Sequence, residues 1–290
     1  MQVLKGKAVA DQIYTTLEVE SATVHDLLRR PPCLAVLLVG DDPASASYVA
    51  SKQRACERLG IDHRDYHLPA DTTEAALLAR IEALNTDDQV DGILVQLPLP
   101  EQINEETIIG AIKAAKDVDG FHPYNVGSLL IGMPTFVSCT PLGILAMLDY
   151  YEIATSGKHV VIIGRSNIVG KPLAALLMQK GRDATVTVAH SRTNDLASLT
   201  RSADILIVAI GRAGFVTADM VGEGAIVIDV GINRVADAST KRGYRIVGDV
   251  AYEEVAPKCK AITPVPGGVG VMTIAMLMHN TIASAKRTDN

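Results

Sequence analysis

The sequence predicts an α/β protein of two domains, an N-terminal α/β catalytic domain and a C-terminal Rossmann-type domain with a parallel sheet. The chain has 290 residues, which is enough for two domains of ordinary size. Short β-branched runs alternate with helical patterns almost throughout, as in βαβ units. Several of these runs are apolar without alternation, which is typical of strands that helices cover on both faces.

Six segments are predicted to be strands: 33–40, 91–98, 159–164, 184–190, 204–211 and 225–231. A domain boundary is expected near residues 139–143, because a loop-rich stretch precedes it and a helical pattern with a fresh strand–Gly–helix unit follows. The last segment, from Met272, is helical, and we expect it to pack back on the first domain. The predicted domains are therefore 1–139 plus 272–290, and 140–271.

Composition narrows the classes of function. Hydrophobic residues make up 48% of the chain and the formal net charge is −6, so a basic nucleic-acid footprint is absent. Neither a membrane-spanning run nor the apolar core of a signal peptide is found, and a cytoplasmic protein is expected. The four cysteines are far apart and outside CxxC pairs, so we predict no metal site and a reducing compartment.

The segment HVVIIGRSNIVGKPLAALLMQKG is predicted to bind a dinucleotide phosphate. A buried strand ends at Gly164, a tight loop follows, and Pro172 lies where a helix begins. The spacing is not GxGxxG, since Ser166 occupies the middle glycine position and Gly170 comes one place late. An ordinary strand–loop–helix corner is the alternative interpretation.

The end of the next strand favours NADP over NAD. NAD-binding folds usually place Asp or Glu there, whereas this strand ends with His190, Ser191 and Arg192. Arg165 in the first loop and Arg192 supply two guanidiniums, and Ser191 supplies a hydroxyl, a set that suits a 2′-phosphate. The alternative is that Arg192 is merely a solvated loop residue.

A second set of polar residues lies in the first half of the chain. Tyr48 and Lys52 are four residues apart, so both lie on one helix face, although such a pair is often structural. Gln96 ends an apolar strand before Leu97 and Pro98, at the edge where open α/β sheets bind ligands.

Two loops complete the candidate site. Asp117 and Asp119 precede a glycine in a turn, and turn capping is the preferred interpretation for Asp117. The run TPVPGGVG, which contains Pro266, Gly267 and Gly268, predicts a rigid loop that lets a flat ligand approach the backbone, with an inter-domain hinge as the alternative.

With these residues assembled, the whole chain resembles the bifunctional methylenetetrahydrofolate dehydrogenase/methenyltetrahydrofolate cyclohydrolase family in its bacterial form. The resemblance begins at residues 4–6 and rests on SYVASK, VQLPLP, KDVDGFHPYN, CTPLG, GRSNIVGKP, GIN, GDV and TPVPGGVG. Ser138 and Val271 depart from it, since proline is usual at both positions, and both replacements are expected to relax the backbone there.

The resemblance implies NADP-dependent oxidation of 5,10-methylenetetrahydrofolate and hydrolysis of the product to 10-formyltetrahydrofolate, in a homodimer with folate in a cleft between the domains. It implies that Lys52 is catalytic, that Tyr48 stacks on the aminobenzoyl ring, that Gln96 partners the lysine and that Asp119 binds the pterin. The substrate-binding set also contains Leu97, Pro98, Pro266, Gly267 and Gly268. The expected cofactor-binding set is Gly164, Arg165, Ser166, Ile168, His190, Ser191, Arg192 and Ile232.

Three other functions stay open at this point. A dehydrogenase of the same family without the hydrolase activity is disfavoured because Tyr48, Lys52, Gln96 and Asp119 occur together. A non-catalytic nucleotide-binding module is disfavoured for the same reason. The third is a short-chain-type dehydrogenase that uses Tyr48 and Lys52. It is disfavoured because in that class the Tyr-x-x-x-Lys pair follows the cofactor loop, whereas here it precedes that loop.

Overall fold

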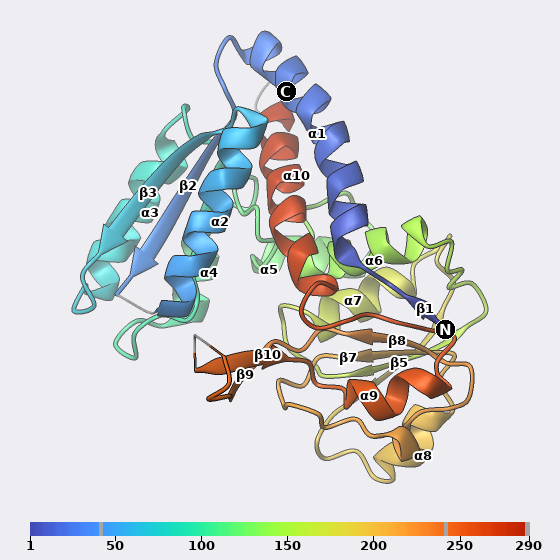
Figure 1. Cartoon of the computed structure of the whole chain (residues 1–290). Helices are drawn as coiled ribbons and strands as arrows, with labels where there is room; N and C mark the ends of the chain where they lie inside the picture. The colour runs from blue at the N-terminus through green and yellow to red at the C-terminus, as the bar shows by residue number, and fades with distance from the viewer. Residues whose placement is uncertain (41–42, 241–242, 288–290) are drawn as a thin grey trace. The chain divides into compact units, whose positions relative to one another are not determined.

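A computed structural model describes residues 1–40, 43–240 and 243–287, except for the side chains of residues 43–48 (Figure 1). Contacts along the chain divide it into two compact units. The three-stranded unit comprises Gln12–Cys139 and Ile274–Asn290, and the six-stranded unit comprises Met1–Asp11 and Thr140–Thr273.

The three-stranded unit is built on a parallel sheet of order β3-β2-β4. Its strands are β2 (Cys33–Val39), β3 (Asp62–Leu68) and β4 (Gly92–Val95). The helices are α1 (Gly6–Leu28), which begins in the other unit, α2 (Pro43–Leu59), α3 (Glu74–Thr86), α4 (Glu105–Ala111), α5 (Pro123–Leu130) and α10 (Met272–Arg287).

Strand β2 is buried along its whole length because helices cover both of its faces (Figure 1). Cys33, Ala35, Leu37 and Val39 point to one face and pack with apolar residues of α3 and α4. The intervening residues are equally buried on the opposite face. This continuous apolar strand, the first of its unit, occupies the centre of the sheet, so its carboxyl end lies at the switch in strand order where open sheets bind ligands.

The six-stranded unit is a parallel sheet of order β1-β11-β8-β7-β5-β6 with a separate antiparallel hairpin. Its sheet strands are β1 (Gln2–Val3), β5 (His159–Ile163), β6 (Thr185–Ala189), β7 (Ile205–Val208), β8 (Ile226–Asp229) and β11 (Ala261–Ile262), and the hairpin is β9 (Asn233–Ala236) with β10 (Tyr244–Val247). Its helices are α6 (Cys139–Tyr150), α7 (Gly170–Leu177), α8 (Leu196–Arg201) and α9 (Tyr252–Val255), with 3-10 turns at Ala218–Met220, Ala256–Lys258 and Val269–Val271.

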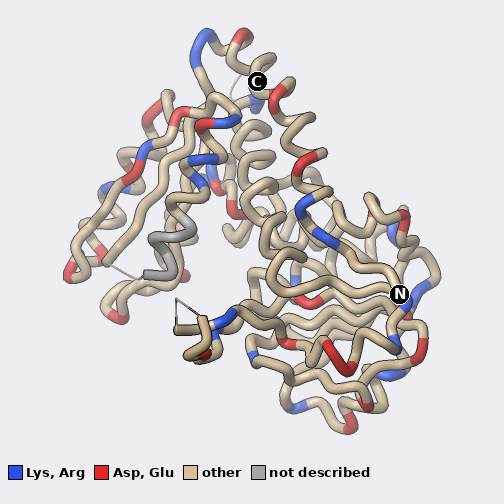
Figure 2. The backbone as a smooth tube through the Cα atoms, in the orientation of Figure 1, with Lys and Arg blue, Asp and Glu red and all other residues tan. Residues whose placement is uncertain are grey.

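An aliphatic core fills the six-stranded unit, as the absence of Trp and the scarcity of Phe require. Val161, Ile163, Leu206, Val208 and Val227 of the central strands share one cluster. Charges of both signs are interspersed along the helices and loops, whereas β2, β5 and β7 carry no charged residue (Figure 2). None of the helices within the described residues is long and apolar enough to cross a membrane.

The six strands predicted from sequence are present as β2, β4, β5, β6, β7 and β8, and the predicted final helix is α10. The sequence analysis missed β3, whose residues DHRDYHL are mostly polar because β3 is an edge strand, and the short strands β1 and β11. Residues 1–11 were expected in the first domain. They belong to the six-stranded unit instead, since β1 pairs with β11 and Leu4 N donates to Ile262 O at 2.8 Å.

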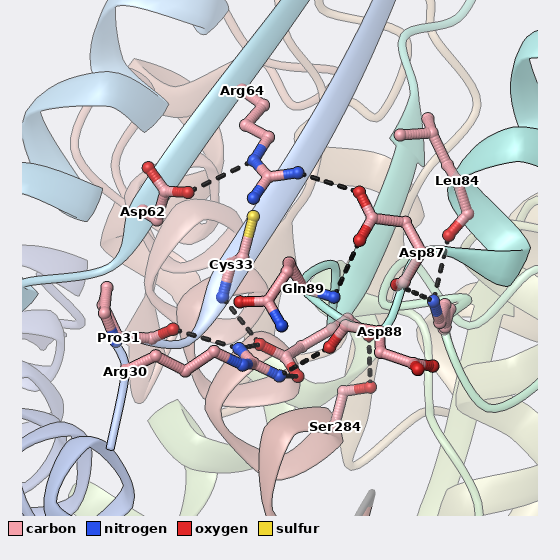
Figure 3. A network of polar contacts seen from close by, with 12 residues as sticks. Arg30, Pro31, Cys33, Asp62, Arg64, Leu84, Asp87, Asp88, Gln89 and Ser284 are labelled. Carbon is pink, nitrogen blue, oxygen red and sulfur yellow. Dashed lines mark hydrogen bonds and ion pairs between the residues drawn. The ribbon is translucent and has the colours of Figure 1, made fainter. Parts of the chain in front are cut away.

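A buried ion pair fixes the amino end of β2 (Figure 3). The Arg30 guanidinium donates to both carboxylate oxygens of Asp91, at 2.7 and 2.8 Å, and Cys33 N donates to one of them at 2.8 Å. The Asp91 side chain is 0% exposed. Such a two-pronged pair with a third donor gives both oxygens of a buried carboxylate hydrogen-bond partners.

We predict that Arg30→Ala destabilises the protein by about 3–5 kcal/mol, the cost of leaving a buried charge without its partner. The free energy of unfolding from urea titration, followed by circular dichroism, measures it. Lys286→Ala is the matched control, because it removes a half-exposed pair with Glu20 in the same unit and is expected to cost no more than about 1 kcal/mol. Equal losses for the two variants would contradict a structural role for the Arg30–Asp91 pair.

Candidate active site and nucleotide-binding loop

Lys52 and Gln96 meet at the carboxyl edge of the three-stranded sheet. Lys52 lies on α2, the helix that follows β2, and is only 6% exposed. Its Nζ donates to Gln96 Oε1 at 2.7 Å. Gln96 comes directly after β4, and its Nε2 donates to Leu97 O at 2.9 Å, which turns Oε1 toward the lysine. The amide therefore holds the amine through a neutral acceptor.

Among the charged groups around Lys52, Asp119 has the largest effect on the pKa of the amine. Burial lowers the pKa of Lys52, and the field of Asp119 opposes that shift. Burial raises the pKa of Asp119 to about 7, and Lys52 opposes that shift in turn. The amine and the carboxyl group are thus both poised to change protonation nearer neutrality than they would in water.

Cys139 is a member of this site that the sequence analysis did not single out. The thiol is buried, and its Sγ donates to Val118 O at 3.7 Å. Burial, and next Asp119, raise the pKa of the thiol well above its ordinary value, so it stays neutral beside the carboxylate. The sequence around a single cysteine does not predict this position, because Cys139 is brought near Val118 and Asp119 only by the fold.

The remaining predicted residues of this unit lie at three places. Leu97 and Pro98 follow Gln96 and are partly or fully exposed at the sheet edge. Tyr48 lies in α2 one turn before Lys52, but its side chain is outside the described residues. Asp117 accepts hydrogen bonds from His122 N at 2.7 Å and Asn125 Nδ2 at 2.8 Å, in agreement with its expected role in the turn.

In the six-stranded unit, Gly164 and Gly170 form a tight strand–loop–helix corner. A Cβ on Gly170 would clash with the carbonyl oxygen of Gly164, and a Cβ on Gly164 would clash with that of Ala209 at the end of β7. Between the glycines, Ser166 Oγ accepts a hydrogen bond from Val169 N at 3.1 Å. No side chain caps the amino end of α7, which begins at Gly170. The corner follows β5, which pairs with β7 on one side and with β6 on the other, so the strand order reverses there. Rossmann-type sheets bind phosphates at such a switch point.

The end of β6 lies beside this corner, since Gly164 N donates to Ala189 O at 2.9 Å. His190 closes a turn in which its Nδ1 accepts from Arg192 N at 3.1 Å, leaving Ser191 and Arg192 exposed. Arg165 is exposed as well. In the part of the chain that the structure describes, neither guanidinium has a hydrogen bond or ion pair with another side chain.

Two buried carboxylates explain why the GIN and GDV motifs occur together. Asp229 accepts hydrogen bonds from the amides of Gly231 and Asp249 at 2.9 Å each, and burial raises its pKa to about 6. Asp249 accepts from Asn233 Nδ2 at 2.8 Å. A Cβ on Gly231 would clash with Asp249, and one on Gly248 would clash with Asp229. This network fixes the loop that carries Ile232.

Two exposed apolar residues lie on loops of the same unit, Ile168 between Gly164 and Gly170 and Ile232 after β8. Ile232 and Ile168 are 51% and 43% exposed. Ile232 also lies against Gly270, at the end of the loop that contains Pro266, Gly267 and Gly268. That loop is held by Gly6, whose amide donates to Gly267 O at 2.9 Å and whose Cα packs against Gly268 O. The loop is therefore rigidly held, and Pro266 and Gly267 are exposed on it.

Comparison with known proteins agrees with this geometry. Residues 4–119 match the family model described as tetrahydrofolate dehydrogenase/cyclohydrolase, catalytic domain, and residues 138–289 match the NAD(P)-binding domain of the same enzymes. A curated bifunctional protein FolD of Chlorobium luteolum is 55% identical over 293 residues, covering 100% of this chain and 99% of that protein.

Solved structures give the same result. The bifunctional FolD enzyme of Campylobacter jejuni is 51% identical with a TM-score of 0.93, over 99% of each chain. The Trypanosoma brucei FolD enzyme, solved with NADP cofactor and inhibitor, is 39% identical with a TM-score of 0.94, over 99% of this chain and 98% of that one. This chain belongs to the tetrahydrofolate dehydrogenase/cyclohydrolase family and carries both its catalytic domain and its NAD(P)-binding domain.

Proposed function

We propose that this enzyme oxidises 5,10-methylenetetrahydrofolate to the 5,10-methenyl form with NADP and then hydrolyses it to 10-formyltetrahydrofolate, with Lys52 as the catalytic residue. The observation that carries the proposal is the buried Lys52 amine, 2.7 Å from a neutral amide acceptor. Both activities belong to the one-carbon chemistry of folate, whose formyl product serves reactions such as purine biosynthesis.

The dehydrogenase step needs geometry more than acid or base. A hydride leaves the bridging methylene while N5 and N10 share the developing positive charge, and NADP supplies the hydride acceptor when bound. A permanently charged ammonium next to that cation would oppose the step. Burial of Lys52 lowers its pKa, and the Gln96 acceptor holds the amine in place in either protonation state.

The hydrolytic step needs a base. Water attacks the methenyl carbon and gives one proton to neutral Lys52, which leaves a hydroxyl on that carbon. As the carbon–N5 bond breaks, the hydroxyl loses its proton and becomes the formyl carbonyl, N5 takes up a proton in its place, and the formyl group stays on N10. A lysine is effective here only if its pKa lies nearer to neutrality than that of a free amine. Gln96 orients the base, and the charge of Asp119 keeps the lowered pKa from falling further.

NADP fits the loop between Gly164 and Gly170. Gly164 and Gly170 have no side chains, so a pyrophosphate can come close to the backbone there. The amino end of α7 has no side-chain cap, so its amides are suited to bind the phosphates. Ser166 lies in that loop, and His190 and Ser191 end the neighbouring strand, where the exposed guanidiniums of Arg165 and Arg192 suit a 2′-phosphate. Ile168 and Ile232 offer apolar contacts to flat rings.

Folate binding is assigned to residues of both units. Asp119 accepts hydrogen bonds from the amino-pyrimidine edge of the pterin, and Tyr48 stacks on the aminobenzoyl ring. Leu97, Pro98, Pro266, Gly267 and Gly268 provide backbone and apolar contacts. We infer that Gln12–Cys139 with Ile274–Asn290 forms the catalytic domain, and that Thr140–Thr273 binds the cofactor.

The oligomeric state and the cellular compartment of the enzyme are inferred from the family resemblance and from the cysteines. A homodimer is expected from the family resemblance. Four buried, unpaired cysteines support residence in the reducing cytoplasm. The net charge of −6 disfavours nucleic acid as a partner.

We predict that Arg165→Ala and Arg192→Ala each lower kcat/KM for NADP about tenfold or more and leave the value for NAD nearly unchanged. Each loses a charge-assisted hydrogen bond to the 2′-phosphate, worth about 1.5–3 kcal/mol. Steady-state rates with both cofactors measure this. Arg201→Ala, an exposed arginine of the same unit that donates to Asp219 O, is the control. Equal efficiency of the parent enzyme with the two cofactors would remove the 2′-phosphate site.

Asp119→Ala is expected to weaken folate binding strongly while NADP binding stays near normal, because the pterin edge loses its acceptor. In the parent enzyme folate binding should strengthen as the pH rises through about 7, where Asp119 ionises, and the variant should lose this dependence. Isothermal titration at several pH values measures both effects. Asp117→Ala is the control: it removes the acceptor of the hydrogen bonds from His122 N and Asn125 Nδ2 and should reduce stability by about 1–3 kcal/mol rather than folate affinity.

Lys52→Met is expected to reduce hydrolysis of added methenyltetrahydrofolate by on the order of a hundredfold, the usual size of a general-base contribution. Dehydrogenation should fall less, since it depends mainly on geometry. Parent hydrolysis should decline as the pH falls through the pKa of Lys52, because protonation removes the base.

Two further variants sharpen the Lys52 test. Lys52→Arg should not restore hydrolysis, because a guanidinium keeps its proton near neutral pH. Gln96→Ala should move both activities in the same direction as Lys52→Met. Separate assays of the two half-reactions decide the matter: hydrolysis at the parent rate in Lys52→Met excludes Lys52 from the mechanism.

A further inference from the structure

Asp119 is placed by its backbone rather than by partners of its carboxylate. No hydrogen bond joins that carboxylate to another side chain within the described residues, although the charge of Lys52 acts on it. A pterin-binding carboxylate must nevertheless hold a defined position, since hydrogen bonds weaken steeply with distance and angle. The residues that fix the backbone on either side of Asp119 therefore determine how well it can bind.

Asn280 of α10 is one of these residues. Its side-chain amide donates to Val118 O at 2.8 Å and to Val137 O at 3.0 Å, and its Nδ2 lies 3.8 Å from Cys139 Sγ. Asn280 is only 3% exposed. One amide group thus joins the loop that carries Asp119 to the loop that ends at Cys139.

The two loops are packed too tightly for Asp119 to shift by itself. Val118 O accepts from Asn280 and also from the neutral Cys139 thiol, so two donors hold the peptide that precedes Asp119. On its other side, Gly120 has φ +71°, and a Cβ there would lie 2.5 Å from the carbonyl carbon of Val137. The backbone of Asp119 is therefore held between an anchored carbonyl and a close-packed glycine.

We propose that Asn280 is a positioning residue for folate, which acts by holding the backbone of Asp119 at the geometry that the pterin requires. The proposal rests on the proposed function, in which Asp119 binds the pterin. Asn280 itself needs no contact with the substrate. Its role depends on two donors of one planar amide reaching two carbonyls at once, which an alanine or a shorter hydroxyl side chain cannot do.

The test compares Asn280→Ala with Ser284→Ala, one turn further along α10. Ser284 is equally buried and also joins two carbonyls, those of Asp91 and Ala115, at 2.6 and 2.8 Å, but neither carbonyl belongs to a peptide that flanks Asp119. We expect Asn280→Ala to raise KM for methylenetetrahydrofolate about tenfold or more, the size expected from a small displacement of a binding group, with KM for NADP unchanged. Ser284→Ala should change neither constant. Asn280→Ser serves the same purpose if the alanine variant does not fold.

A double variant makes the test specific. In an Asp119→Ala background, Asn280→Ala should have no further effect on KM for folate, because the group that it positions is gone. The same increase in both backgrounds, a parent-like KM in Asn280→Ala and Asn280→Ser, or an equal increase in Ser284→Ala would each overturn the proposal. If Asp119→Ala alone keeps the KM of the parent, the assignment of Asp119 to the pterin fails instead, and that outcome is distinct from the others.

Discussion

A buried amine whose countercharge is a half-buried carboxyl group is the constraint on which the three-stranded unit depends. Lys52 is taken out of water by the helix that follows β2, and its Nζ has the Gln96 amide as its hydrogen-bond partner. Burial alone would push the pKa of Lys52 down and that of Asp119 up, and each moderates the shift of the other. The two groups can moderate each other's pKa shifts only while α2, the end of β4 and the Asp119 loop hold their positions.

Both units solve the positioning problem with the same element, the carboxyl edge of a parallel sheet. In one unit the switch in strand order lies beside β2, and in the other beside β5. Carboxylates then hold the loops at that second edge. Asp229 and Asp249 are buried and accept amide hydrogen bonds from segments that follow β7, β8 and β10. Glycines at 231 and 248 are needed because these carboxylates occupy the space of a side chain.

The sequence predicted those parts of the molecule whose signals are local. Continuous apolar strands such as CLAVLLV and ILIV are legible because burial on both faces leaves no alternation. Gln96 was found because a polar residue and prolines end such a strand. By contrast, the first four positions of β3 are all charged or histidine and one more histidine follows, so exposure at the sheet edge hides the strand from sequence analysis. Cys139 and Asn280 were missed because a buried thiol or amide acquires its meaning only from partners distant in sequence.

Because α10 completes a unit whose other parts lie before residue 140, that unit is discontinuous along the chain. A ribosome makes the sheet, Lys52 and Asp119 before residues 140–273, and Asn280 and Ser284 after them. Until then the carbonyls of Val118, Val137, Asp91 and Ala115 lack the side-chain donors that α10 brings them. The three-stranded unit therefore cannot form these hydrogen bonds during synthesis until the segment that builds most of the six-stranded unit has been made.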